Sequence, residues 1–152
     1  MAIEWQSQGY PSMFFANIAQ EGRFMPDDYA AAAARHYHDA ESLAANARYD
    51  NAGHLIGFAI ECAIKKKLRE IHKNPTMICE GHHPTVQAEL RRTLSSRGMS
   101  GPWLSISQDK KLLQGWLVGD RYSADGAVSQ AKYGEWLASA QKVLSVAGIK
   151  KK

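Results

Sequence analysis

The sequence has few cysteines, no long hydrophobic run and almost no strand signal. Cys62 and Cys79 are the only cysteines among 152 residues. Two isolated cysteines do not provide the disulfide framework of a small secreted domain, and they indicate reduced thiols. The longest apolar stretch, residues 30–34, is much shorter than the about 20 residues that a membrane-spanning helix requires. The N-terminus also lacks the basic start and apolar run of a secretory signal, so we expect a cytoplasmic protein without membrane association.

The excess of positive charge is small. The formal net charge is +4, and Lys150, Lys151 and Lys152 supply most of it. Bulk charge is therefore weak evidence for nucleic-acid binding, which usually shows as a strong basic excess. Hydrophobic residues make up 45% of the chain and charged residues 22%, as is normal for a globular domain that buries one core.

Helical periodicity recurs in every long segment of the chain. We predict helices over about residues 26–48, 52–71, 84–98 and 128–147, a loop at 119–126, and a short fourth helix after Ser107 that buries Leu112, Leu113, Trp116 and Leu117. Short connections favour an all-α fold, an antiparallel (up-and-down) bundle of about five helices. We assign residues 1–25 to an aromatic-rich N-terminal arm, 26–148 to the bundle and 149–152 to a basic tail.

The segment 52–71 combines a nearly continuous apolar surface with one narrow polar stripe. Apolar residues on almost all sides of its first half predict the central, buried helix of the bundle. The stripe lies on one side of that helix and consists of His54, Gly57, Glu61 and Lys65. Glu61 and Lys65 form either a structural ion pair or, with the other two residues, part of a binding site that faces a cleft or a second copy.

Several short motifs occur in a fixed order around this stripe. Residues 51–68 contain the pattern Ala-x-Glu-x-Ala-x-Lys, and residues 39–43 read Asp-Ala-x-x-Leu. Further along the chain, Gly-His-His at 81–83 precedes an amphipathic helix, and Arg121 and Tyr122 follow. In these residues and in their order, the chain resembles the HEPN superfamily over about residues 29–147.

The HEPN resemblance implies a compact helical bundle that forms a homodimer and serves in a bacterial toxin–antitoxin or defence system. The implied partners are RNA or a nucleotide, and a cognate antitoxin or a nucleotidyltransferase-like protein. No cofactor is implied. Catalytic members are metal-independent ribonucleases with an Arg-x(4-6)-His motif, and two such pairs meet across the dimer. Histidine can transfer a proton near neutral pH, and arginine can stabilise the developing phosphate charge.

The usual C-terminal motif is missing, because no histidine follows Arg121 within the required range. Arg48 and His54 have the required spacing, although they flank the start of the central helix, which is not the usual place. We predict no metal site. The candidate catalytic residues are Arg48, His54 and Arg121, and the candidate binding residues are Gly57, Glu61, Lys65 and Tyr122.

Besides a purely structural interaction protein that docks through its aromatic N-terminal arm, two interpretations of function remain open from the sequence. One is a non-catalytic HEPN-like module that binds RNA, a nucleotide or a protein partner. The other is a metal-independent endoribonuclease that uses Arg48 with His54, or Arg121 with a histidine distant in the sequence. The missing C-terminal histidine favours the first interpretation.

Overall fold

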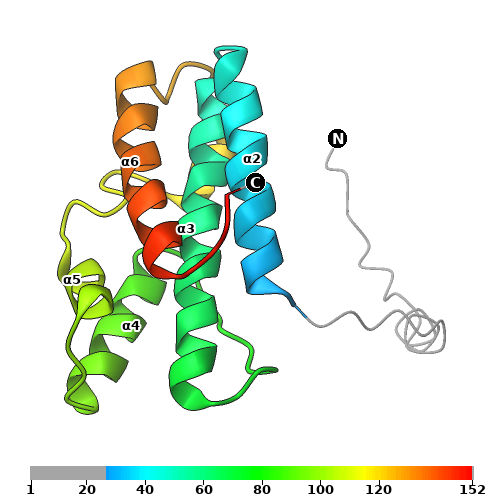
Figure 1. Cartoon of the computed structure of the whole chain (residues 1–152). Helices are drawn as coiled ribbons and strands as arrows, with labels where there is room; N and C mark the ends of the chain where they lie inside the picture. The colour runs from blue at the N-terminus through cyan, green and yellow to red at the C-terminus, as the bar shows by residue number, and fades with distance from the viewer. Residues whose placement is uncertain (1–26, 152) are drawn as a thin grey trace, which may run out of the picture.

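The computed structural model describes residues 27–151, which form five α-helices and one short 3-10 helix and contain no strand (Figure 1). The elements are α2 (Tyr29–Ala45), α3 (Tyr49–His72), α4 (Thr85–Ser96), α5 (Pro102–Gln108), the 3-10 helix η1 (Val118–Tyr122) and α6 (Gln130–Val146). The all-α class is confirmed for this part of the chain. The arm predicted for residues 1–25 lies outside the described residues.

Helices α2 and α3 form a long hairpin. Helix α2 begins where the Asp28 side chain accepts a hydrogen bond from the N–H of Ala31 at 2.9 Å, as an N-cap does. The side of α2 that faces α3 buries Ala33, Tyr37 and Ala40. Small alanine side chains let the two helix backbones approach closely. Only three residues connect the helices, so they run in opposite directions (Figure 1).

Helix α3 is the central element of the bundle, as the sequence predicted. It contacts α2, α4, α6 and η1, and its fully buried side chains include Ala52, Ile56, Ala59, Ile60 and Ala63. The helix ends at His72, and the left-handed backbone of the next residue, Lys73 (φ 51°), turns the chain away from the helix axis. No helix in residues 27–151 combines the length and apolar character needed to cross a membrane.

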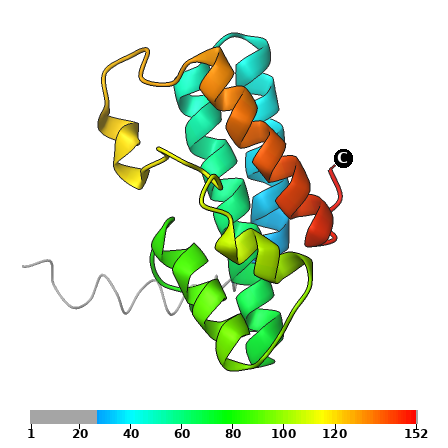
Figure 2. The ribbon, with the colours of Figure 1, turned by 90° about the vertical axis from the view of Figure 1, so that its left-hand side faces the viewer.

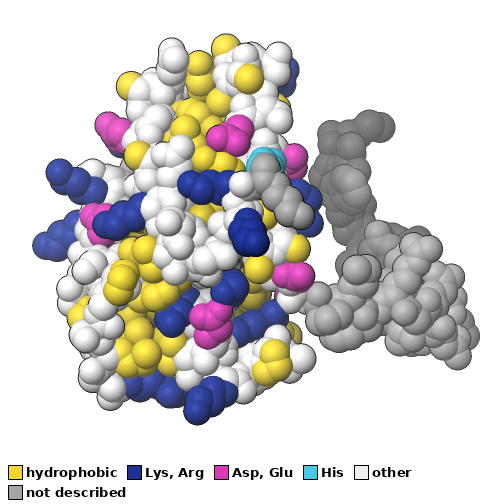
Figure 3. Space-filling model, in the orientation of Figure 1, with side chains coloured by type: hydrophobic (Ala, Val, Ile, Leu, Met, Phe, Trp, Pro, Cys, Tyr) yellow, Lys and Arg dark blue, Asp and Glu magenta, His cyan; other side chains and the backbone are white. Residues whose placement is uncertain are grey.

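The remaining helices cover α3 in two places. Helix α6 packs along the upper half of α3 and runs in the same direction, whereas α4 packs on the lower half and α5 packs on α4 (Figures 1 and 2). The predicted up-and-down order of all helices is therefore not confirmed. Lys and Arg side chains are spread among acidic and uncharged ones over the face in Figure 3, so no single basic patch dominates that face.

The fourth helix lies earlier in the chain than the sequence predicted. It begins at Pro102, which suits the first helical position, and it ends at Gln108. The predicted helix after Ser107 is wrong, because Leu113 (φ 51°) and Gly115 (φ 83°) adopt left-handed backbone that breaks a helix. The hydrophobic residues of this segment are still mostly buried. Leu112, Leu113 and Trp116 lie in the core, whereas Leu117 is 56% exposed.

Trp116 fixes this irregular segment to the central helix. Its indole Nε1 donates a buried hydrogen bond of 3.1 Å to the carbonyl oxygen of Gly53. The ring lies directly on Gly57, where a Cβ atom would fall well inside van der Waals contact with three indole atoms. Gly53 is similarly covered, since a Cβ there would lie 2.8 Å from the Trp136 ring. Glycine at both positions therefore lets two indoles reach the backbone of α3.

This packing predicts opposite effects for two Gly→Ala substitutions. Gly57→Ala should destabilise the protein by about 2 kcal/mol or more, because overpacking against a rigid indole outweighs the gain of about 1 kcal/mol in helix propensity. Gly134→Ala, in α6 with no atom within 4 Å of the added Cβ, should stabilise it by about 0.5–1 kcal/mol. Chemical denaturation of both variants measures the difference. Equal stability of the two variants would show that Trp116 is not packed on Gly57.

Candidate functional site

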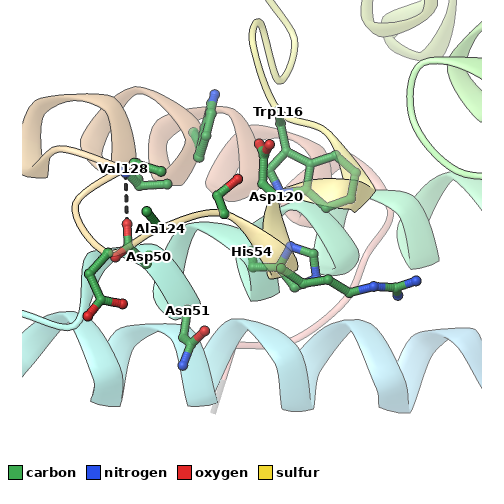
Figure 4. A pocket seen from close by; sticks show the side chains of 12 residues that line it. Asp50, Asn51, His54, Trp116, Asp120, Ala124 and Val128 are labelled. Carbon is green, nitrogen blue, oxygen red and sulfur yellow. Dashed lines mark hydrogen bonds between the residues drawn. The ribbon is translucent and has the colours of Figure 1, made fainter. Parts of the chain in front are cut away.

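A small cavity of about 110 Å³ lies between the first turns of α3, the 3-10 helix η1 and the loop that leads to α6 (Figure 4). His54 of α3, Asp120 and Arg121 of η1, and the indoles of Trp116 and Trp136 all line it. These residues come from three separate parts of the sequence. The cavity is therefore a product of tertiary packing.

Asp50 closes the far side of this cavity. Its two carboxylate oxygens accept hydrogen bonds of 2.8 Å from the backbone N–H groups of Gly126 and Val128, the second of which is drawn in Figure 4. These backbone hydrogen bonds lower the pKa of the Asp50 carboxyl, because they stabilise its charged form. The carboxylate thus holds the loop before α6 against the first turn of α3.

His54 lies among aromatic rings at the cavity wall. Its ring stacks on the Trp116 ring with centroids 5.6 Å apart. It is also in an edge-on arrangement with the Phe58 ring, with centroids 4.7 Å apart. Its Nδ1 atom is buried and has no hydrogen-bond partner. Burial lowers the pKa of His54, and the positive charge of Arg121 lowers it further. His54 is therefore mainly neutral at pH 7.

Arg121 and Tyr122 stand at the surface beside the cavity. The guanidinium carbon of Arg121 lies 5.0 Å from the centroid of the Tyr122 ring, and Tyr122 is 81% exposed. The turn that carries them is held by the Asp120 carboxylate, which accepts a hydrogen bond of 3.2 Å from the N–H of Leu117. A planar aromatic ring and a guanidinium group are thereby presented together to solvent.

Arg48 does not join this group. It is exposed, immediately precedes α3, and is not among the residues that line the cavity. Arg48 and His54 are six positions apart in the sequence. At about 100° per helical residue, their side chains point about 120° apart around the helix axis. The structure therefore brings His54 together with Arg121 and not with Arg48.

The lower half of the polar stripe forms a separate charge cluster around one buried carboxylate. Glu61 is only 4% exposed, and its carboxylate lies 2.9 Å from the Lys65 ammonium and 3.1 Å from Nδ1 of His82. His82 belongs to the loop before α4, so this carboxylate fastens the loop to α3. This geometry favours a structural role for Glu61 and Lys65. In the described part of the chain, no three His, Cys, Asp or Glu side chains are arranged to hold a metal ion.

Sequence reasoning missed most of the cavity lining, including Asp50, Asp120 and the two tryptophans. The sequence predicts Trp116 only as a core residue and Asp120 only as part of a loop. Asp120 directly precedes Arg121 and Tyr122 in the sequence, and this run of polar and aromatic residues was the one available signal. Nothing in the sequence indicated that these residues would face the first turns of α3.

Comparison with known proteins finds no match for this chain among protein-family models, curated proteins or solved structures. The geometry of the cavity and the resemblance carried by the sequence motifs are therefore the grounds for assigning a function.

Three histidines with lowered pKa values predict that stability falls in mild acid. Burial lowers the pKa values of His36, His54 and His83 below the ordinary 6.5. The unfolded chain then binds protons more readily, so the free energy of unfolding should decrease as pH falls from about 6.5 through the lowered pKa values. Above pH 7 these histidines should not change the free energy of unfolding as pH rises.

Urea unfolding between pH 5 and 8 measures this dependence. His83→Gln should reduce the fall below pH 6.5, because His83 is the most enclosed of the three. His72→Gln, which changes an exposed histidine, is the matched control and should leave the fall unchanged. An unaltered pH dependence in His83→Gln would contradict this explanation.

Proposed function

We propose that this chain is an HEPN-like helical module that binds single-stranded RNA or a nucleotide at the cavity between α3 and η1. The observation that carries the proposal is the pairing of an exposed tyrosine, Tyr122, with the guanidinium of Arg121 at the edge of a cavity lined by His54. Support for the HEPN-like part of the proposal comes from the motifs at residues 39–43, 51–68 and 121–122.

Each of these three side chains has a distinct use in binding a nucleotide. An exposed aromatic ring stacks on a base, a contact worth about 1–3 kcal/mol. A guanidinium group pairs with phosphate oxygens through two parallel hydrogen bonds. A neutral histidine with an unpartnered nitrogen adds a directional hydrogen bond without repelling other cations. Tyr122, Arg121 and His54 provide these groups in that order.

The biological setting of the proposal follows from the HEPN resemblance. We propose a homodimer in which the two Arg121–His54 sites lie near each other, in a toxin–antitoxin or defence system. Arg121 and Tyr122 are exposed, which is compatible with contact to a second copy. A cognate antitoxin or nucleotidyltransferase-like protein stays a prediction of the same resemblance.

A second candidate function is metal-independent RNA cleavage at the same cavity. The lowered pKa of His54 favours it, because a mainly neutral imidazole can accept a proton at pH 7. His54 would take the proton of a ribose 2′-hydroxyl, whose oxygen attacks the adjacent phosphorus. The 5′-oxygen leaves and takes a proton from solvent, and a 2′,3′-cyclic phosphate remains. Arg121 would stabilise the charge on the phosphate oxygens.

The binding proposal predicts that substitutions in η1, and not elsewhere on the surface, weaken the affinity for RNA. Tyr122→Ala and Arg121→Ala should each weaken binding of a labelled single-stranded RNA of mixed sequence by about tenfold, as the loss of a stacked base or a phosphate contact implies. Fluorescence anisotropy at fixed salt measures the dissociation constants. Arg92→Ala, at a 77% exposed arginine on α4, is the control and should change binding less than twofold. An equal loss in Arg92→Ala and Arg121→Ala, with no loss in Tyr122→Ala, would mean that binding depends only on general charge.

The cleavage candidate predicts activity that survives chelation of metals. Cleavage of the same RNA in excess EDTA should yield ends with a 2′,3′-cyclic phosphate, and His54→Ala should lower the rate at least about 100-fold. Mass spectrometry identifies the ends. His72→Ala should cleave at the native rate. RNA that is bound but left intact by the native chain would remove this candidate and leave the binding proposal in place.

A further inference from the structure

The cavity between α3 and η1 is too small for a whole nucleotide. Its volume is about 110 Å³, whereas sites that enclose small molecules usually measure about 300–1,000 Å³. Two indoles, those of Trp116 and Trp136, form part of its wall. A space of this size with aromatic sides accommodates one flat ring system, so only part of a nucleotide would enter it.

The charge of the lining indicates which part enters. Asp50, Asp120 and Asp125 line the cavity, and Arg121 is the one cationic lining residue. Carboxylates repel phosphate and accept hydrogen bonds without donating any. A phosphate would therefore stay outside with the exposed Arg121, and the group inside must present N–H donors.

Of the three carboxylates, Asp120 is the one close enough to His54 to act on its pKa, whereas Asp125 is exposed. Both oxygens of Asp50 already accept backbone hydrogen bonds from the loop before α6. Asp120 accepts one backbone hydrogen bond through Oδ2, and its other oxygen has no hydrogen bond among the described residues. A second polar atom also lacks a partner here, the buried Nδ1 of His54. Both residues are labelled at the cavity in Figure 4.

We propose that this cavity is a guanine pocket. Guanine is the one common nucleobase whose Watson–Crick edge presents two adjacent donors, N1–H and the 2-amino group, and these match the two oxygens of a carboxylate. Asp120 accepts both, and the His54 ring, which lines the cavity, donates one N–H to the guanine O6. The base lies against the small exposed parts of the two indoles, while Arg121 binds its phosphate.

This inference rests on the proposed function and adds the identity of the bound base. The test titrates the full chain with guanosine, inosine and adenosine 5′-monophosphates by isothermal calorimetry. Guanosine monophosphate should bind at least about tenfold more tightly than adenosine monophosphate, as a good bidentate contact implies. Inosine monophosphate, which lacks only the 2-amino group, should fall between them.

Asp120→Asn tests the carboxylate while it keeps an oxygen that can accept the Leu117 N–H. It should remove the preference for guanosine monophosphate over adenosine monophosphate. Asp39→Asn removes the same charge from the exposed side of α2, outside the cavity lining, and should keep the preference. Because the inosine comparison uses the native chain, the inference stays testable even if Asp120→Asn does not fold.

The outcomes separate this inference from the proposed function. Equal affinities for the three nucleotides, with RNA binding that still depends on Arg121 and Tyr122, would overturn the guanine pocket and keep the RNA module. Absence of all RNA and nucleotide binding would overturn both. Binding of tetramethylammonium that depends on Asp120 and displaces guanosine monophosphate would assign the cavity to a cation and likewise overturn the inference.

Discussion

The packing of Trp116 on two glycines of α3 is the contact on which the candidate site depends. Its indole hydrogen-bonds to the carbonyl oxygen of Gly53 and occupies the space that a side chain at Gly57 would fill. Residues 109–117 have no regular helix to place them, so this buried anchor sets where the chain enters η1. Arg121 and Tyr122 follow this anchor in the chain, so the position of Trp116 on α3 brings them to the start of that helix.

The polar stripe of α3 performs two separate tasks along its length. Near the start of the helix, His54 has a lowered pKa and an unpartnered nitrogen at a cavity wall. Farther along, Glu61 is enclosed with Lys65 and His82 and fastens a loop. A buried carboxylate needs such partners, because an unpaired buried charge is costly. The difference in hydrogen bonding separates His54, which has an unpartnered nitrogen, from residues that are already satisfied within the fold.

The cavity combines features that suit different parts of one ligand. Its carboxylates and indoles suit a base that donates hydrogen bonds, whereas the exposed Arg121 and Tyr122 beside it suit phosphate and a neighbouring base. This division resolves the apparent conflict between an acidic cavity and an anionic ligand. Since the net charge of the chain is small, recognition through a few placed groups would account for the proposed binding better than general attraction.

The sequence by itself determined the all-α class, the central position of α3 and most of the buried residues, because these follow from local helical periodicity. It misplaced the fourth helix, since the left-handed backbone at Leu113 is imposed by packing and leaves no periodic signal. It paired His54 with Arg48 by spacing alone. Only the tertiary structure decided that His54 lies at the same cavity as Arg121, about seventy residues away in the chain. Trp116 and Asp50 hold two irregular segments against α3 through contacts between residues far apart in the sequence, and local periodicity carries no signal for such contacts.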